Sequence, residues 1–422
     1  MADDESGVGR KIAYYRARKG LSQRDFAPLI KRSEAWVSQV ERGVRPVKAL
    51  DVLERIAEVL EIPVAELAPT APTAQAEPVP AYVLALRLLL ARDHALRAAV
   101  SEVREGFDLD LLADQVESAW ALTRQARYAD LRTLLQSLVP DLEAAAGAGL
   151  TRADTLLADT YQVWAVALAE LRQFDAAWAA AERAMGKAQR SADPILMAAC
   201  AFRRTIIFQR AQHLDLARQT ADSARAALET LLDQSAPRAL TVYGGLTLQS
   251  AIIAARIEDA ERAREMLTRA RKVASALGAD REEYRIAFGP TAVDLHEVAA
   301  AVELGDAGTA IRLAGRIDGK NLPDFDRVRL VVDTARAWTQ RRNPERALSL
   351  LLEAEALAPE QVRRHLSVRS ATADLLSMDQ RTPGLAEFAR RIGVDAPFVP
   401  SPGGRPAAPR AVLRAARGPR TI

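Results

Sequence analysis

The chain has 422 residues, of which 49% are apolar and 5% aromatic, and its formal net charge is +3. This length allows two or three domains, and the dominance of Ala and Leu over aromatic residues favours helices. The acidic, polar start is unlike a signal peptide, the longest apolar run is too short to span a bilayer, and the single cysteine, Cys200, has no partner for an internal disulfide, so we expect a soluble, cytoplasmic protein.

Two short helix patterns joined by a tight turn occupy residues 21–43. Ser33 is a good N-cap for the second, because its hydroxyl can accept hydrogen bonds from the free amides of the first turn. Val37 and Val40 share the side expected to face the core, and Gly43 ends the pattern as a left-handed cap. A short helix with an apolar back and a small, hydrogen-bonding front suits the major groove, so the pattern predicts a helix-turn-helix.

The segment L-S-Q-R-D-F-A…S-E-A-W-V-S-Q-V-E-R-G resembles a lambda-repressor-like DNA-binding domain of the XRE family. The resemblance covers residues 8–67 and implies an internal ion pair between Arg16 and Glu41. Lys31 stands where family members often carry Gly, and Pro28 removes one hydrogen bond, so we expect a somewhat irregular second helix. The five helices are expected near 8–19, 23–30, 33–42, 47–60 and 63–67.

The same resemblance implies how this domain meets DNA. Glu34, Ala35 and Gln39 are expected to face base edges, and Gln23 to contact a phosphate. Residues 8–48 contain eleven Lys or Arg and three Asp or Glu, an excess of positive charge that attraction to phosphates requires; a basic face that is merely solvated is the alternative. The expected DNA-binding residues are Gln23, Ser33, Glu34, Ala35, Trp36, Ser38, Gln39, Arg42 and Arg45.

A proline-rich linker is predicted over residues 68–80, where four prolines in thirteen residues prevent a helix. It separates a DNA-binding domain of residues 1–67 from a second domain of residues 81–378. The second domain begins with a long helix predicted over about 81–105. Residues 379–422 are rich in Pro, Gly, Ala and Arg, and we expect a largely disordered basic tail that either adds non-specific phosphate contacts or has no role.

From about residue 108 the chain repeats a pattern of paired helices. A small or aliphatic residue in the second helix of each pair recurs seven positions later. The pairs of marker residues are Leu131/Leu138, Ala177/Ala184, Ala217/Ala224, Ala263/Ala270 and Ala347/Ala354, with Ala310 alone in a sixth copy. Such an array predicts an α-solenoid of about six antiparallel pairs between 108 and 358, closed by a helix near 361–377.

The solenoid resembles known repeat families in two ways. In the last copy Ala335, Trp338, Ala347, Ala354 and Pro359 fall at the offsets of a tetratricopeptide repeat. The whole chain also resembles actinobacterial XRE regulators that carry such repeats after the DNA-binding domain. This resemblance implies an effector and dimerisation domain of all-α fold.

One stretch interrupts the helical pattern of the repeats: F-G-P-T at residues 288–291, followed by His296. Gly-Pro is expected to end one helix and Thr291 to begin the next. A comparable F-G-P-T…H segment occurs in the effector region of the resembling regulators. The segment either contacts a ligand on the inner face of the solenoid or is a kink where repeats pack.

The first helix of each pair is expected to line that inner face. Arginines and amides there can hold a peptide backbone or a carboxylate, although long polar side chains are equally compatible with a solvated surface. The expected ligand-binding residues are Tyr161, Arg204, Tyr243, Gln249, Thr291, His296 and Arg336.

No motif of a nucleotide-binding, hydrolytic or metal-dependent enzyme occurs in the sequence, and the four histidines lack the spacing of metal ligands. We therefore expect no catalytic activity, no cofactor and no metal. The sequence predicts a transcription regulator that binds a palindromic operator as a homodimer, senses a peptide or small-molecule effector and does not contact a membrane. The alternatives are a regulator whose solenoid only dimerises or docks a protein and, less favoured, a helical-repeat enzyme.

Overall fold

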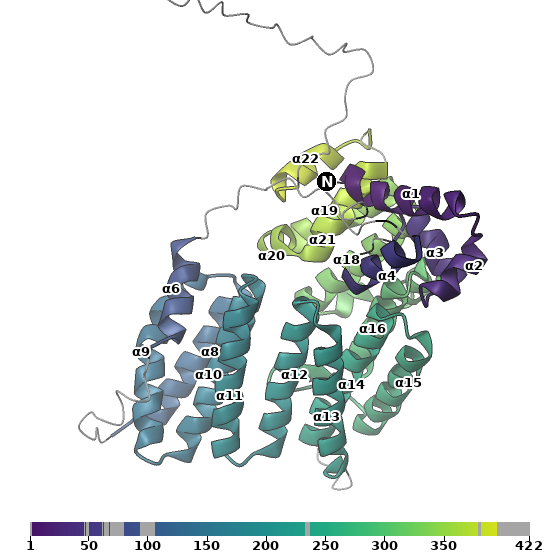
Figure 1. Ribbon diagram of the computed structural model, residues 1–422. Coiled ribbons are helices and arrows are strands. Elements are labelled where there is room, and N and C mark those ends of the chain that lie inside the picture. The colour runs from purple at the N-terminus through teal and green to yellow at the C-terminus, as the bar shows by residue number, and fades with distance from the viewer. Residues whose placement is uncertain are drawn as a thin grey trace, which may run out of the picture.

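The computed structural model describes residues 2–45, 47, 50–60, 62, 67, 80–92, 106–232, 237–378 and 381–394. Within these residues the chain is helical except for one two-stranded hairpin. A small N-terminal group of helices lies against one end of a long array of paired helices (Figure 1). No helix in this described part is long and apolar enough to cross a membrane. Residues 68–79 of the linker predicted over 68–80, and most of the predicted fifth helix at 63–67, fall outside the described residues.

The N-terminal group consists of α1 (Ala2–Arg18), α2 (Gln23–Leu29), α3 (Glu34–Glu41) and α4 (Leu50–Leu60). Its side chains form a hydrophobic core of their own, centred on Ile12, Phe26, Ile30 and Ile56. Helix α1 begins at Ala2, before the predicted start at residue 8. The other helix boundaries agree with the prediction to within a few residues, because local caps and apolar spacing define them.

The connection between α2 and α3 has the conformation that the sequence indicated. Ser33 Oγ accepts from the Trp36 amide at 3.2 Å, and Gly43 ends the motif with a φ of 70°. Lys31 adopts a φ of 53°, a left-handed conformation that is costly for a residue with a β-carbon. Pro28 lies in the last turn of α2, which ends one residue later. The tight turn brings α3 to the surface of the domain.

Six helix pairs follow, as predicted. The first helices are α8 (Leu109–Arg124), α10 (Thr151–Glu170), α12 (Pro194–Arg210), α14 (Pro237–Arg256), α16 (Pro290–Glu303) and α18 (Asp324–Gln340). The second helices are α9 (Tyr128–Gly147), α11 (Phe174–Arg190), α13 (Leu214–Glu229), α15 (Ala260–Leu277), α17 (Ala307–Ala314) and α19 (Pro344–Leu357). A short 3-10 helix, η2 (Gly319–Asn321), precedes α18.

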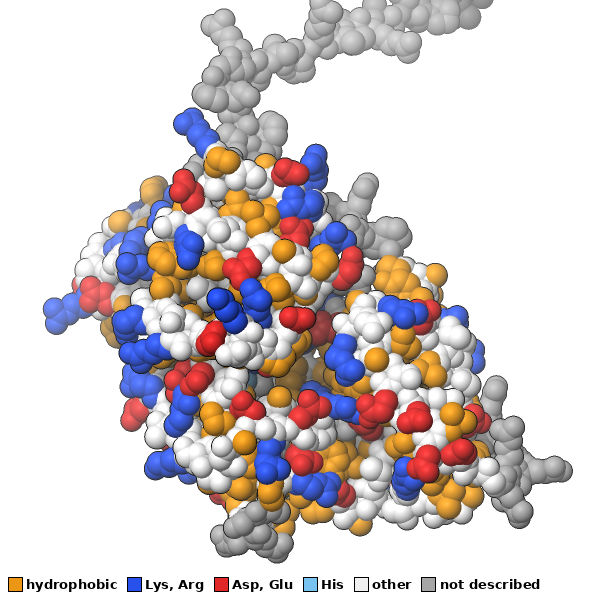
Figure 2. Space-filling model, turned by 180° about the vertical axis from the view of Figure 1, so that it is seen from behind, with side chains coloured by type: hydrophobic (Ala, Val, Ile, Leu, Met, Phe, Trp, Pro, Cys, Tyr) orange, Lys and Arg blue, Asp and Glu red, His pale blue; other side chains and the backbone are white. Residues whose placement is uncertain are grey.

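The first helix of each pair packs directly on the first helix of the next pair. Successive second helices are instead bridged by long side chains, such as Lys187 to Glu143 at 2.6 Å. This difference curves the array, with the first helices on its inner side. Seen from behind, the molecule carries interspersed basic and acidic side chains and is hollowed near its centre (Figure 2).

The marker residues of the repeats are packing positions between the two helices of a pair. Leu131, Ala177, Ala263 and Ala347 are fully buried, because a small or aliphatic residue there lets neighbouring helices approach closely. A left-handed residue lies five positions before the marker in every pair and closes the turn between its two helices. These turn residues are Ala126, Arg172, Gln212, Glu258, Gly305 and Arg342.

The two ends of the array differ from the prediction. Helix α6 (Ala81–Leu90) ends at Leu90 and is much shorter than the helix predicted to residue 105; residues 93–105 lie outside the described residues. After the six pairs come α20 (Pro359–Arg364), α21 (Leu366–Met378) and α22 (Leu385–Arg391). Leu385 and Phe388 are fully buried, so the chain stays folded beyond residue 379, where the basic tail was predicted to start. Residues 395–422 lie outside the described residues.

The F-G-P-T segment also differs from the prediction. Strands β1 (Arg281–Glu283) and β2 (Ile286–Phe288) form an antiparallel hairpin before α16, where a simple helix-to-helix break was expected. Phe288 and Ile286 pack on a Gly-Gly pair in α14: a β-carbon at Gly244 would lie 2.2 Å from the Phe288 ring, and one at Gly245 would lie 2.5 Å from Ile286. The hairpin is therefore seated where two consecutive side chains are missing from a helix.

Candidate nucleic-acid interface and candidate effector site

Polar contacts within the helix-turn-helix domain join α1 and α2 to the end of α3. Arg16 Nε lies 2.5 Å from Glu41 Oε1, and Arg16 Nη2 lies 2.9 Å from Glu41 Oε2, which confirms the predicted ion pair. Gln23 Nε2 donates to the same carboxylate at 2.7 Å. The side chain predicted to contact a phosphate is thus fixed by the ion pair that joins α1 to α3.

The two ends of α3 differ in exposure. Ser33, Glu34 and Ala35 are exposed at its first turn, as expected of residues that meet DNA. Gln39 and Ser38 are only partly exposed nearer the end of the helix. The same part of the helix faces the array of helix pairs α8–α19, called the solenoid below, as the contacts of Arg45 with Glu258 and Glu303 show.

Trp36 is not the accessible DNA-contacting side chain that the sequence suggested. It is 5% exposed, and the Arg32 guanidinium lies 5.6 Å from the centre of its ring. Trp36 also hydrogen-bonds Glu258, at the turn between α14 and α15. Its place beside a solenoid residue shows that the two parts of the chain share an interface.

That interface covers the last turn of α3 and the loop after it. The Arg45 guanidinium lies 3.0 Å from Glu258 and donates to the Glu303 carbonyl at 3.3 Å. The backbone carbonyl of Arg42 accepts a hydrogen bond from Arg342, in the turn between α18 and α19. Two arginines predicted to meet DNA are therefore in contact with the solenoid.

Three of the predicted ligand-binding residues face the second helices and not the inner side. The Tyr161 hydroxyl lies 3.1 Å from Glu143 of α9, and Arg204 pairs with Glu182 of α11 at 2.7 Å. Both side chains lie between helices. The sequence could not show this, because polarity alone does not distinguish the packed faces of a helix from the face toward the groove.

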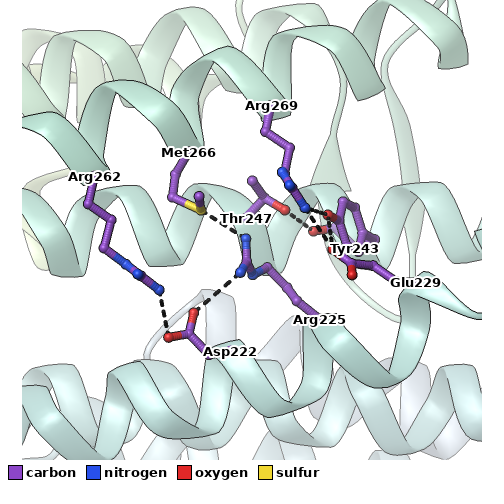
Figure 3. Close-up of polar contacts among 8 residues, drawn as sticks. All are labelled: Asp222, Arg225, Glu229, Tyr243, Thr247, Arg262, Met266 and Arg269. Carbon is purple, nitrogen blue, oxygen red and sulfur yellow. Dashed lines mark hydrogen bonds and ion pairs between the residues drawn. The ribbon is translucent and has the colours of Figure 1, made fainter.

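Tyr243 is the third such residue. Figure 3 shows it among the side chains that bridge α13 and α15. Its hydroxyl lies 3.0 Å from Glu229 and accepts from Arg269 at 2.9 Å, while Arg262 pairs with Asp222 at 2.7 Å beside it. This network holds second helices together and leaves Tyr243 no part in a groove.

The other predicted residues belong to the inner layer of first helices. Gln249 accepts from Gln209 at 2.9 Å. Arg336 pairs with Asp333 at 3.1 Å and with Glu303 at 3.2 Å. These contacts join α12 to α14 and α16 to α18, so the inner face is tied together by polar side chains.

Thr291 and His296 both belong to the first half of α16. The Thr291 amide donates to Asp280 at 3.0 Å. His296 is 6% exposed, and its Nδ1 lies 2.6 Å from the Ala292 carbonyl, which can only accept, so Nδ1 carries the proton. The other ring nitrogen, Nε2, is buried and has no partner among the described residues. Burial holds the pKa of His296 well below its ordinary value.

Arg329 of α18 completes this cluster and was not singled out from the sequence. Burial lowers its pKa, and Asp333 and Asp326 oppose that change through space. Arg329 forms no hydrogen bond or ion pair with any residue that the structure describes. The signal in the sequence is the alternation of Asp326, Arg329, Asp333 and Arg336 at helical spacing, which places acids and arginines along one side of α18.

A chain of charges leads from this cluster to the helix-turn-helix domain. Glu303, at the end of α16, lies 3.2 Å from Arg336 and 3.5 Å from Arg256. Although burial favours the neutral acid, the two arginines hold the pKa of Glu303 at about 2. The Glu303 backbone carbonyl in turn accepts from Arg45. The inner layer and the loop after α3 are therefore in direct contact.

Residues 8–69 match a family described as a helix-turn-helix domain. No curated protein and no solved structure shows a significant match to the chain. The match covers the N-terminal helices and supports the class that the fold indicates: a helix-turn-helix domain, which is a DNA-binding fold, followed by a large region of paired helices.

Proposed function

We propose that the chain is a sequence-specific transcription regulator whose paired helices sense a ligand. The observation that carries the DNA-binding part is the helix-turn-helix match at residues 8–69 together with the excess of Lys and Arg over residues 8–48. Positive charge concentrated on this domain favours phosphate contact, and the exposed first turn of α3 offers Glu34 and Ala35 to base edges. The proposal includes no catalytic activity.

The cluster at His296 and Arg329 supports the sensing part. Arg329 is half-buried and has no paired acid among the described residues, which favours an anionic ligand, because a guanidinium binds a carboxylate with two parallel hydrogen bonds. The unpartnered His296 Nε2 is an acceptor for a ligand N–H or O–H group. We infer an effector that carries a carboxylate beside a hydrogen-bond donor, such as a peptide C-terminus or a small acid.

The charges that follow Arg329 along α18 supply a route from ligand to DNA. A carboxylate bound at Arg329 would compete with Asp333 for the positive charge of Arg329, and Asp333 also pairs with Arg336. Arg336 contacts Glu303, and Glu303 contacts Arg45. A change in this network alters the contact between solenoid and DNA-binding domain, and by linkage DNA would alter ligand affinity to the same extent.

The DNA-binding part is tested by selection of duplexes from a random-sequence library with the full chain. We expect enrichment of paired half-sites about one helical turn apart, since one recognition helix covers too few base pairs for genomic specificity. If the selected duplexes bind no more tightly than the starting library, sequence-specific recognition is refuted.

The sensing part is tested by operator affinity with and without the small-molecule fraction of a cell extract. Thr291→Ala, His296→Ala and Arg329→Leu should lose the response, which in coupled systems amounts to about 1–3 kcal/mol. Arg327→Leu is the matched control, because Arg327 lies on the same helix but pairs with Glu353 of α19. An equal response in all four variants would exclude this site. No response from the wild type would support a solenoid that only dimerises or docks a protein.

A further inference from the structure

The turns of three successive helix pairs form one row along the edge of the solenoid. Glu258, Gly305 and Arg342 occupy the same left-handed position in their turns, five residues before the markers Ala263 and Ala347 and the lone Ala310. Each of the three touches the helix-turn-helix domain, although the chain places more than 180 residues between them and that domain. Repeat symmetry thus presents three equivalent contact points to one partner.

Glu258 makes the central contact. Its carboxylate lies 3.0 Å from the Arg45 guanidinium and 3.6 Å from Arg32 Nε, and it accepts from the Trp36 side chain. The side chains of Arg45 and Glu258 are both 19% exposed. One negative group held by two arginines and an indole N–H on a basic domain is the arrangement that a DNA phosphate would adopt there.

The two flanking turns contact the neighbouring part of the same surface. A β-carbon on Gly305 would lie 2.8 Å from Gln39 Oε1, so the amide predicted to read a base edge rests on the backbone of the turn. Arg342 donates to the carbonyl of Arg42. Helix α1 of the same domain packs against α21. The contact therefore involves α1, α3 and the segments next to α3, on the side of the array near α16–α21 where Figure 1 shows α1–α4.

We propose that this row of turns is a docking surface for the DNA-reading side of the chain's own helix-turn-helix domain, with Glu258 in the place of a DNA phosphate, so that the last turn of α3 binds either the solenoid or DNA. The inference rests on the proposed DNA-binding function and adds its regulation. The docked arrangement, with α3 against the row of turns, excludes DNA. Gln39 cannot contact Gly305 and a base edge at once, and Arg45 cannot pair with Glu258 and a phosphate at once.

The contact has the character of a reversible one. Burial raises the pKa of Glu258 against the attraction of Arg45 and Arg32. Burial also lowers the pKa of Arg45 against the attraction of Glu258 and Glu303. In both groups the loss of hydration outweighs the gain from pairing, which is common for partly buried ion pairs. The exposed first turn of α3, with Ser33 and Glu34, leaves DNA a first point of contact before release.

The first test compares DNA affinity of four full-length variants by fluorescence anisotropy on a short random-sequence duplex and on a duplex selected from a library. Glu258→Gln keeps the shape of the side chain and removes its charge, and Arg342→Ala removes the contact with the Arg42 carbonyl. Both lie outside the DNA-reading surface. The matched controls are Glu265→Gln, an exposed acid of α15, and Arg341→Ala, the exposed neighbour of Arg342.

We expect Glu258→Gln to bind both duplexes more tightly than the wild type by about 10-fold, because a binding-competent state that is rarely populated weakens apparent affinity by that fraction. Arg342→Ala should bind more tightly by a smaller factor, and the two controls should match the wild type. Unchanged or weaker binding by both test variants would overturn the proposal. A gain that grows with protein concentration would assign the contact to a second copy and overturn the intramolecular arrangement.

The second test is hydrogen exchange measured by mass spectrometry on the wild type, with and without the selected duplex. DNA should protect peptides of α3 and, in the opposite direction, expose the turn peptides around residues 256–260 and 303–307. Glu258→Gln should show the exposed turns without DNA. If DNA leaves these turns as protected as before, docking and DNA binding coexist and the inference fails.

The two tests separate this inference from the proposed function. If neither the wild type nor Glu258→Gln binds any duplex, the proposed DNA-binding function fails. In that case the exchange of the turn peptides in Glu258→Gln still reports whether the docked contact exists, and unchanged exchange would refute the docking surface as well.

Discussion

The packing of the hairpin on α14 predicts that replacing glycine by alanine has opposite effects on stability at two helical glycines, Gly244 and Gly186. Gly244 lies under the ring of Phe288, where a β-carbon would come within 2.2 Å of two ring atoms. Phe288 is 1% exposed and belongs to a closed apolar cluster, so the ring has little room to move. Gly186 is an exposed helical glycine of α11 with no atom within 4 Å of its β-carbon position.

The magnitudes follow from two competing terms. Alanine gains about 1 kcal/mol over glycine in the interior of a helix. A methyl group forced into a well-packed core costs about 1–3 kcal/mol. Gly186→Ala has only the first term and should stabilise the chain by about 0.5–1 kcal/mol. Gly244→Ala has both terms, and contacts as short as 2.2 Å put its cost at the upper end, so we expect a net loss of about 1–2 kcal/mol.

The assay is urea unfolding of the full chain followed by circular dichroism, together with hydrogen exchange of residues 281–288. Exchange is needed because helical arrays can unfold in parts, so that one transition need not report the hairpin. Phe288→Leu added to Gly244→Ala should restore part of the loss, because the smaller side chain makes room for the methyl group and the two effects are then non-additive. Stabilisation of Gly244→Ala to the same extent as Gly186→Ala would refute the seating of the hairpin.

Four further outcomes are expected. Gln39→Ala should weaken binding to the selected duplex by about 1–3 kcal/mol and relax preference at one base pair; equal loss on random DNA would remove Gln39 from base reading. Arg42→Ala should weaken all duplexes alike and flatten the fall in affinity between about 50 and 200 mM salt, whereas an unchanged salt dependence would exclude a phosphate contact. Light scattering should show a homodimer, and a monomer on a non-palindromic site would contradict the paired-site prediction. Burial lowers the pKa of His296 from 6.5. The stabilisation by neutral His296 is therefore complete above pH 6.5 and is lost as the pH falls below that value, by up to about 1.4 kcal/mol per pH unit. His296→Gln should show a smaller drop in melting temperature than the wild type between about pH 7.5 and about pH 5.5, and an equal drop would show that His296 does not titrate with unfolding.

Some parts of the candidate sites could be predicted residue by residue. The Ser33 cap, the left-handed Lys31 and Gly43, and the Arg16–Glu41 pair all lie within one small domain and are recognisable from local spacing and family resemblance. The last described helix, α22, could also have been recognised, since Leu385, Phe388 and Ile392 have the spacing of an apolar helix face.

Other parts were mispredicted because polarity does not show which way a helix faces. Tyr161 and Tyr243 are polar residues of first helices, yet each hydroxyl bonds an acid on a neighbouring second helix. The hairpin was missed because its strands have three residues each, too few for a period-two pattern, and because its support is a Gly-Gly pair about 40 residues earlier in the chain.

By itself, the sequence determined the helix-turn-helix domain and the six helix pairs. Each depends on caps, apolar periodicity and small residues within about 40 positions of one another, and a repeat can be detected in a sequence over that range. Only the tertiary structure decided that Glu258, Gly305 and Arg342 meet the last turn of α3. The curvature of the array sets that meeting, and curvature is a sum of small rotations at every interface between neighbouring pairs, none of which leaves a local pattern in the chain.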